Sequence, residues 1–258
     1  MKVGVALSGG GARGIAHLGV LKAFDELGIK PGIFSGVSSG AIASVFYAAG
    51  YKPEEILKLI KELSLFKIVR PAFGKRGLFH LDEVEKLYKT HLGINATFED
   101  LSIPVIISAT EMNEGVTAYY SSGDLIQPLI ASSAVPILYK PISYQGKLLN
   151  DGGLLNNMPV EPLLHNCDVK IGVHVNPINH QARITTLRSM VERTVHLAIN
   201  NNVKIRTPLC DFFIEPTELK HYRLMSFGKA DELFNIGYKY TMNLERHLKQ
   251  LVNSPSIS

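Results

Sequence analysis

The chain has 258 residues, of which 46% are hydrophobic, 8% aromatic and 19% charged. This composition supports one sizeable core and excludes a disordered, collagen-like or coiled-coil protein. Lys and Arg number 27 and Asp and Glu number 23, so the net charge of +4 is too small to indicate a nucleic-acid-binding protein.

The hydrophobic pattern predicts strands that alternate with helices. Short apolar runs predict strands, and apolar residues at three- and four-residue spacing predict helices. The predicted strands are residues 2–7, 31–37, 105–109, 116–120, a hairpin at 142–149 that turns at Gln145 and Gly146, 169–175 and 211–214. The predicted helices are residues 15–27, a small-residue helix that ends at Gly50, 53–63, a helix that starts on a capping box of Asp82 and Glu85 and ends near Gly93, 124–134, 186–200 and 230–251. This order predicts a three-layer α/β/α fold with a mostly parallel central sheet, in a single domain over residues 1–258 with a frayed tail at 254–258.

The cysteine spacing and the lengths of the apolar runs indicate which metal, disulfide and membrane features to expect. Cys167 and Cys210 lack the spacing of a zinc site or a disulfide framework, so we expect reduced, packed thiols and no metal. The longest nearly uncharged apolar run, residues 41–51, is too short to cross a bilayer, and the N-terminal apolar run is too short for a signal peptide. We therefore expect a cytoplasmic protein.

A glycine-rich loop follows the first predicted strand and opens the first predicted helix. Its members are Gly9, Gly10, Gly11, Ala12, Arg13 and Gly14. Backbone N–H groups at such a helix start can face an anion, because glycines leave access to them. The same glycines fit the GxGxxG pattern of a dinucleotide-binding loop, but that fold needs an acidic residue at the end of the second strand. The second predicted strand ends in Gly-Val-Ser-Ser-Gly instead, which disfavours a dinucleotide site.

The end of the second strand carries a GxSxG pattern formed by Gly36, Ser38 and Gly40. In this pattern the serine occupies a sharp turn between a strand and a helix, where the glycines relieve crowding. Neighbouring parallel strands bring their following loops together, so we expect Ser38 to face the amides of the glycine-rich loop. Amides in such a position can stabilise an oxyanion by about 3 kcal/mol per donor. The pattern therefore predicts a nucleophilic serine.

A serine nucleophile needs a base, and Asp151 is the best candidate. It precedes Gly152 and Gly153 directly after the predicted hairpin, and these glycines let the backbone turn tightly toward another loop. An ordinary Asp-Gly turn would give the same pattern, and taken alone that interpretation is favoured. Burial among neighbouring leucines would raise the basicity of this carboxylate above that of an exposed aspartate.

These segments together resemble the patatin-like phospholipases. Four blocks match in the family's order, at residues 9–14, 36–40, 131–136 and 151–153. The resemblance implies a Ser-Asp dyad with Ser38 as nucleophile and Asp151 as base, and an oxyanion loop at residues 9–14 in which Arg13 adds charge or braces the loop. It also implies hydrolysis of a carboxylic ester in a phospholipid or related lipid through an acyl-serine intermediate, without metal or organic cofactor. Because the chain is short, we expect it to be one of the compact bacterial-type members.

Other interpretations of the chain stay open. A catalytically idle lipid-binding or regulatory protein can have the same fold. An α/β-hydrolase that uses His174 is a minor alternative, and His17 is a further histidine to test. The oligomeric state is open as well.

The stretch that begins at Leu65 and ends at Leu81 mixes four basic residues with three phenylalanines and lacks acidic residues. This composition suits a cap over the acyl pocket that makes peripheral contact with an anionic membrane surface. It suits equally a solvated loop whose phenylalanines complete the core.

Overall fold

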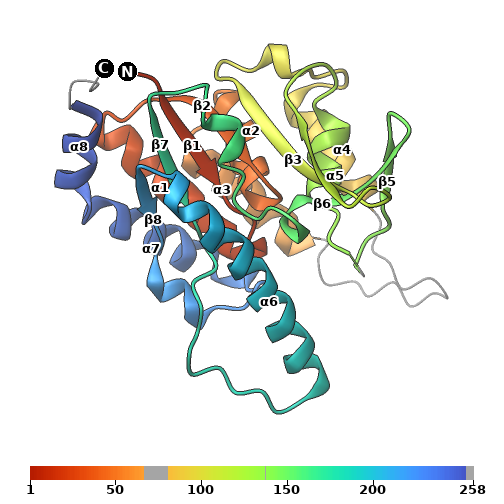
Figure 1. Cartoon of the computed structure of the whole chain (residues 1–258). Coiled ribbons are helices and arrows are strands. Elements are labelled where there is room, and N and C mark those ends of the chain that lie inside the picture. Colours follow the sequence, from red (N-terminus) through yellow and green to blue (C-terminus); the bar gives the residue numbers. More distant parts are fainter. Residues whose placement is uncertain (67–80, 137, 254–258) are drawn as a thin grey trace.

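A computed structural model describes residues 1–66, 81–136 and 138–253. The fold is organised around an eight-stranded sheet with the order β5-β6-β3-β2-β1-β7-β8, in which β4 also pairs with β3 (Figure 1). The strands are β1 (Val3–Leu7), β2 (Pro31–Gly36), β3 (Val105–Glu111), β4 (Val116–Tyr120), β5 (Ile142–Tyr144), β6 (Lys147–Asp151), β7 (Val169–Val173) and β8 (Phe212–Ile214). The helices are α1 (Ile15–Leu27), α2 (Ser39–Ala48), α3 (Pro53–Phe66), α4 (Asp82–Leu92), α5 (Ile126–Ser132), α6 (Leu187–Arg206), α7 (Ala230–Met242) and α8 (Glu245–Asn253).

The predicted fold class is confirmed. Strands β3, β2, β1, β7 and β8 run parallel, whereas β4, β5 and β6 join antiparallel at one edge. The predicted hairpin turns at Gln145 and Gly146, both of which have the positive φ values (49° and 73°) that a tight two-residue hairpin turn needs. The sheet is therefore mixed and mostly parallel.

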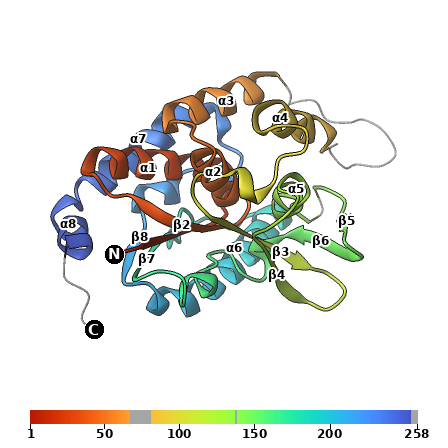
Figure 2. The same ribbon diagram turned by 90° about the horizontal axis from the view of Figure 1, so that it is seen from above.

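Apolar side chains cover both faces of the sheet. Figure 2 shows α1, α2, α3 and α7 on one face and α6 on the other. Successive side chains of a strand point to opposite faces, so Val5 and Leu7 of β1 join the larger core cluster while Ala6 joins a second cluster with Met158 and Val203. The parallel strands are buried on both sides for this reason.

The register of the sheet brings the ends of β2 and β6 together. Gly36 at the end of β2 pairs with Ile107 of β3, and Asp151 at the end of β6 pairs with Ala109 of β3. Strand β4 pairs with β3 along residues 107–111, so β2 and β6 both occupy the opposite edge of β3. Because β2 runs parallel to β3 and β6 runs antiparallel to it, their carboxyl ends point toward each other.

Two predicted helix features are wrong. The capping box at the start of α4 is not formed: Leu81 takes the N-cap position without a side-chain cap, and Glu85 pairs with Lys89 instead (2.6 Å). The predicted terminal helix is divided into α7 and α8, and at the break the Leu244 amide donates to the Thr241 carbonyl (3.0 Å). The second helix then inserts Leu248 into the core.

Candidate active site

The residue at the predicted turn, Ser38, has a backbone conformation that only a constrained turn maintains. Its φ of 52° and ψ of −124° lie outside the regions that L-residues prefer, between the end of β2 and the start of α2. A Cβ at Gly40 would lie 2.2 Å from the Leu7 carbonyl oxygen, and one at Gly36 would lie 2.8 Å from the backbone of Ala41. Both glycines are thus needed for the close approach of α2 to β1 and β2.

The backbone of this turn is fixed by a serine from another helix. The Ser38 amide donates to Ser132 Oγ at the end of α5 (2.8 Å), and Ser132 Oγ donates to the Ser108 carbonyl of β3 (2.7 Å). All three residues are buried. In the sequence, residues 131–136 are marked only as one block of the family resemblance, so the sequence did not reveal this hydroxyl as a support of the turn.

Asp151 lies at the end of β6 and contacts Ser38. Its carboxylate accepts hydrogen bonds from the Ser38 side chain and, at Oδ1, from the Gly153 amide (2.8 Å). Both Ser38 and Asp151 are buried, with 8% and 7% of their surface exposed. Burial raises the pKa of Asp151 from 3.8 to about 6, and the two hydrogen bonds offset part of this rise because they favour the charged form. The structure therefore brings the predicted serine and aspartate together, as the register of β2 and β6 on β3 requires.

The glycine-rich loop lies beside Ser38. A Cβ at Gly9 would lie 3.3 Å from Ser38 Cβ. Three amides of the loop already have acceptors: Gly9 donates to the Asn157 carbonyl (3.2 Å), Ala12 to the Leu224 carbonyl (2.7 Å) and Arg13 to the Gly10 carbonyl (3.1 Å). Among the described residues, the amides of Gly10 and Gly11 have no acceptor. Ala12 and Arg13 are members of the loop whose amides were expected to face an oxyanion, but these two amides are already bonded. The amides of Gly10 and Gly11 therefore are the ones that can donate to it.

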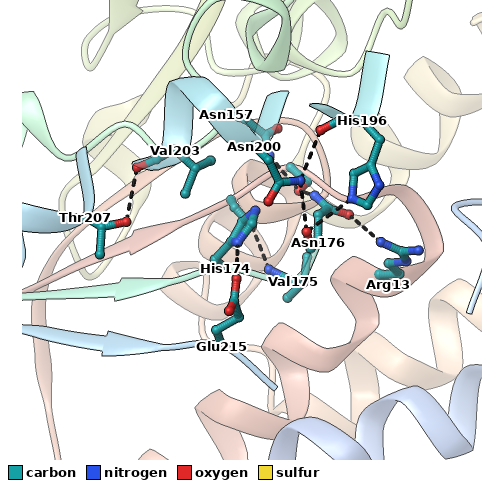
Figure 3. Close-up of polar contacts among 12 residues, drawn as sticks. Arg13, Asn157, His174, Val175, Asn176, His196, Asn200, Val203, Thr207 and Glu215 are labelled. Carbon is teal, nitrogen blue, oxygen red and sulfur yellow. Dashed lines mark hydrogen bonds and ion pairs between the residues drawn. The ribbon is translucent and has the colours of Figure 1, made fainter. Parts of the chain in front are cut away.

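Arg13 contacts Tyr222 and Asn176 and braces the glycine-rich loop. Its Nε and Nη2 donate to the Tyr222 carbonyl (2.8 and 2.5 Å), and Nη1 donates to Asn176 Oδ1 (3.5 Å), a contact drawn in Figure 3. Its side chain is buried, and this burial lowers the pKa of the guanidinium to about 10. Of the two roles that the resemblance implied for Arg13, these contacts support the brace.

Asn157 joins the glycine-rich loop to the turn that carries Asp151. Its Nδ2 donates to the Gly9 carbonyl (3.3 Å), and its Oδ1 fills the space that a Cβ of Gly9 or of Gly153 would enter at 2.6 Å. The backbone amide of Asn157 donates to Asn202 Oδ1 of α6 (2.9 Å). The glycines on both sides thus admit one amide side chain that holds the two loops in contact.

Asn176, just after β7, is a second asparagine that holds the loop. Its Nδ2 donates to the Gly9 carbonyl (2.6 Å). Its own carbonyl accepts hydrogen bonds from Asn200 (3.1 Å) and, depending on the tautomer, from His196 (3.2 Å), both on α6 (Figure 3). No motif in the sequence indicated Asn176, because a single asparagine after a strand has many structural uses.

Neither His174 nor His17 contacts the predicted nucleophile among the described residues. His174 Nδ1 bonds Glu215 (2.9 Å), and His17 Nε2 bonds the Ser8 carbonyl (2.7 Å). Burial lowers the pKa of His17 to about 4, so this ring is neutral at physiological pH. Neither His17 nor His174 therefore completes a triad with Ser38 in the described part of the chain.

The stretch from Leu65 to Leu81, which suits a cap and a solvated loop equally, falls largely at residues 67–80, outside the described residues. Within the described ranges, no helix is both long and apolar enough to cross a bilayer, and no group of three or more His, Cys, Asp or Glu side chains is arranged to hold a metal ion.

A family model described as patatin-like phospholipase matches residues 5–164, a span that includes both glycine loops, Ser38 and Asp151. The chain belongs to the patatin-like phospholipase family. Members of this family are carboxylic ester hydrolases that act on lipids, so the predicted resemblance is confirmed.

The sequence of this patatin-like protein is similar to those of curated proteins from a yeast and a mycobacterium. It is 28% identical to the lysophospholipase NTE1 of Kluyveromyces lactis over 99% of this chain and 20% of that protein. It is 32% identical to an uncharacterized NTE family protein of Mycobacterium bovis over 68% of this chain and 49% of that protein. The chain thus spans about a fifth to about half of the length of these relatives.

The fold of the patatin-like protein also resembles solved structures. VipD from Legionella pneumophila superimposes with a TM-score of 0.60 at 16% identity, over 95% of this chain and 67% of that one. ExoU of Pseudomonas aeruginosa, in complex with SpcU, gives a TM-score of 0.50 at 15% identity, over 98% of this chain and 53% of that one. At these identities the likeness concerns the fold alone.

Proposed function

We propose that this chain is a serine acyl hydrolase that cleaves a carboxylic ester of a phospholipid or related lipid, with Ser38 as nucleophile and Asp151 as base. The observation that carries the proposal is the hydrogen bond from the Ser38 side chain to a buried carboxylate whose pKa is raised to about 6. A carboxylate with this pKa is a stronger base than an exposed aspartate, and it is still mostly ionised at neutral pH. The family supports the same class of reaction.

In the proposed reaction Asp151 accepts the hydroxyl proton while Ser38 Oγ bonds to the ester carbonyl carbon. The carbonyl oxygen becomes an oxyanion, for which the amides of Gly10 and Gly11 are the available donors of the glycine-rich loop. The intermediate then expels the alcohol, which takes the proton from Asp151 and leaves an acyl-serine. A water molecule attacks this ester, gives its proton to Asp151, and the fatty acid leaves as Ser38 recovers its hydrogen.

A lipid panel tests this proposal. The panel includes lysophospholipids, diacyl phospholipids, triacylglycerols and a soluble short-chain ester, and released fatty acid is measured. Wild type is expected to release fatty acid from at least one ester lipid, whereas Ser38→Ala and Asp151→Asn are expected to be inactive. Ser39→Ala is the matched control, because its hydroxyl is buried without a hydrogen-bond partner among the described residues.

A fluorophosphonate probe separates an enzyme from an idle lipid-binding protein. We expect stoichiometric labelling at Ser38 in the wild type and in Ser39→Ala, and no labelling of Ser38→Ala. Absence of labelling together with absence of fatty-acid release would favour the idle protein on the same fold.

A further inference from the structure

A segment outside the family match contacts the glycine-rich loop. Residues 165–258 lie beyond the stretch that matches the family model. Among them, residues 222–226 link the 3-10 helix at Thr217–His221 to the 3-10 helix at Phe227–Lys229. We refer to residues 222–224 as the bridging segment.

Three independent features tie the bridging segment to the loop. The Ala12 amide donates to the Leu224 carbonyl (2.7 Å), and the Arg13 guanidinium donates twice to the Tyr222 carbonyl (2.8 and 2.5 Å). Gly11 has a positive φ of 55°, and a Cβ there would lie 2.5 Å from the Leu224 carbonyl oxygen. The loop therefore lacks a side chain at the point where this carbonyl approaches it.

The bridging segment is itself fixed in place. The Tyr222 amide donates to the carbonyl of Leu219, a fully buried residue, and the Tyr222 hydroxyl donates to Glu232 of α7 (both 3.1 Å). A turn follows, in which the Arg223 amide donates to Ser226 Oγ (3.0 Å) and the Ser226 amide donates to the Arg223 carbonyl (3.1 Å). The two acceptor carbonyls are thus presented by an anchored stretch of backbone.

These contacts hold the loop on both sides of its two available amides. On one side, Asn157 and Asn176 bond the Gly9 carbonyl. On the other side, the bridging segment bonds Ala12 and Arg13. The amides of Gly10 and Gly11 lie between these fixed points, and an oxyanion donor must be placed within a few tenths of an ångström to act fully.

We propose that the carbonyls of Tyr222 and Leu224 position the oxyanion loop, and that Arg13 is a positioning residue that binds this loop to the bridging segment. The inference rests on the proposed acyl hydrolase function. It assigns part of the active-site support to the region beyond the family match. It also gives the buried guanidinium a task that depends on its forked geometry, which a lysine of the same charge does not reproduce.

The test measures kcat and KM on a soluble short-chain ester together with thermal unfolding. Arg13→Lys keeps the charge but loses the two hydrogen bonds to the Tyr222 carbonyl, and we expect kcat to fall about a hundredfold with KM within about twofold. In the described part of the chain, Ser226 bonds neither Arg13 nor the glycine-rich loop, and Ser226→Ala removes the acceptor of the Arg223 amide. We expect it to lower kcat by about threefold to tenfold, and Ser226→Thr to restore kcat because it retains the hydroxyl.

The outcomes separate this inference from the proposed function. A wild type that neither hydrolyses esters nor depends on Ser38 refutes the proposed function itself. If the wild type is active through Ser38 and Arg13→Lys keeps at least half of its kcat, the positioning inference is overturned. The inference is also overturned if Arg13→Lys loses activity while Ser226→Ala does not, because the loss then belongs to the guanidinium alone. If Arg13→Lys does not fold, the two Ser226 variants decide. The inference is then overturned if Ser226→Ala does not lose activity.

Discussion

We expect Asp151→Asn to stabilise the folded protein at neutral and higher pH. Asp151 binds its proton more tightly in the folded protein than in the unfolded chain, because burial raises its pKa from 3.8 to about 6. Both states are protonated below pH 3.8, so the group then makes no difference to stability. As the pH rises from 3.8 to about 6, the unfolded chain loses this proton first and the folded state is progressively disfavoured.

The magnitude follows from the same pKa. A rise from 3.8 to about 6 corresponds to about 3 kcal/mol of free energy that the folded state loses once the carboxylate is ionised. Asparagine is neutral and of nearly the same shape, its Oδ1 can still accept from the Gly153 amide, and its Nδ2 can donate to Ser38 Oγ. We therefore expect Asp151→Asn to raise the free energy of unfolding by up to about 3 kcal/mol at pH 8 and by close to zero near pH 4.

Urea unfolding followed by circular dichroism from pH 4 to pH 8 measures this difference. Glu62→Gln, which removes one exposed carboxylate from α3, controls for the change in net charge. An Asp151→Asn protein that is less stable than wild type at pH 8, or a difference that does not vary with pH, would refute the reasoning. The expected gain in stability together with the loss of hydrolysis would mark Asp151 as a residue whose burial serves activity at the expense of stability.

Two more predictions concern the pH dependence of hydrolysis and the support of the serine turn. The kcat/KM of the wild type for a soluble ester should rise about tenfold per pH unit below pH 6 and level off above it, because only ionised Asp151 can accept the serine proton; a flat profile from pH 5 to pH 8 would contradict this assignment. Ser132→Ala leaves a buried amide at Ser38 and a buried carbonyl of β3 without a partner, so we expect the free energy of unfolding to fall by about 2 to 4 kcal/mol and kcat to fall with it. Ser44→Ala is the control, since among the described residues that buried hydroxyl bonds only the carbonyl four residues earlier in the chain. Equal losses in the two variants would argue against a special role for Ser132.

Much of the fold was predictable because its signals are local. The order of strands and helices follows from apolar spacing, and the hairpin turn follows from Gln145 and Gly146, which adopt the positive φ values that this turn requires. Features that depend on contacts between distant elements were not predictable. The break between α7 and α8 is one of them, because no proline or glycine marks it and Leu248 reaches the core only when the helices are packed.

The sequence by itself determined the positions where the backbone must be unusual. Glycines around Ser38 and after Asp151 mark places where a Cβ would collide with neighbouring atoms. Because only glycine lacks a Cβ, the residue type alone identifies these positions. Only the tertiary structure decided which groups meet there. Strands β2 and β6 end against each other on one edge of β3, and the carbonyls of Tyr222 and Leu224 reach the glycine-rich loop from the far end of the chain. Every residue has a backbone carbonyl, so residue type does not indicate which carbonyls will bond the glycine-rich loop. The packing of the folded chain decides which carbonyls reach it.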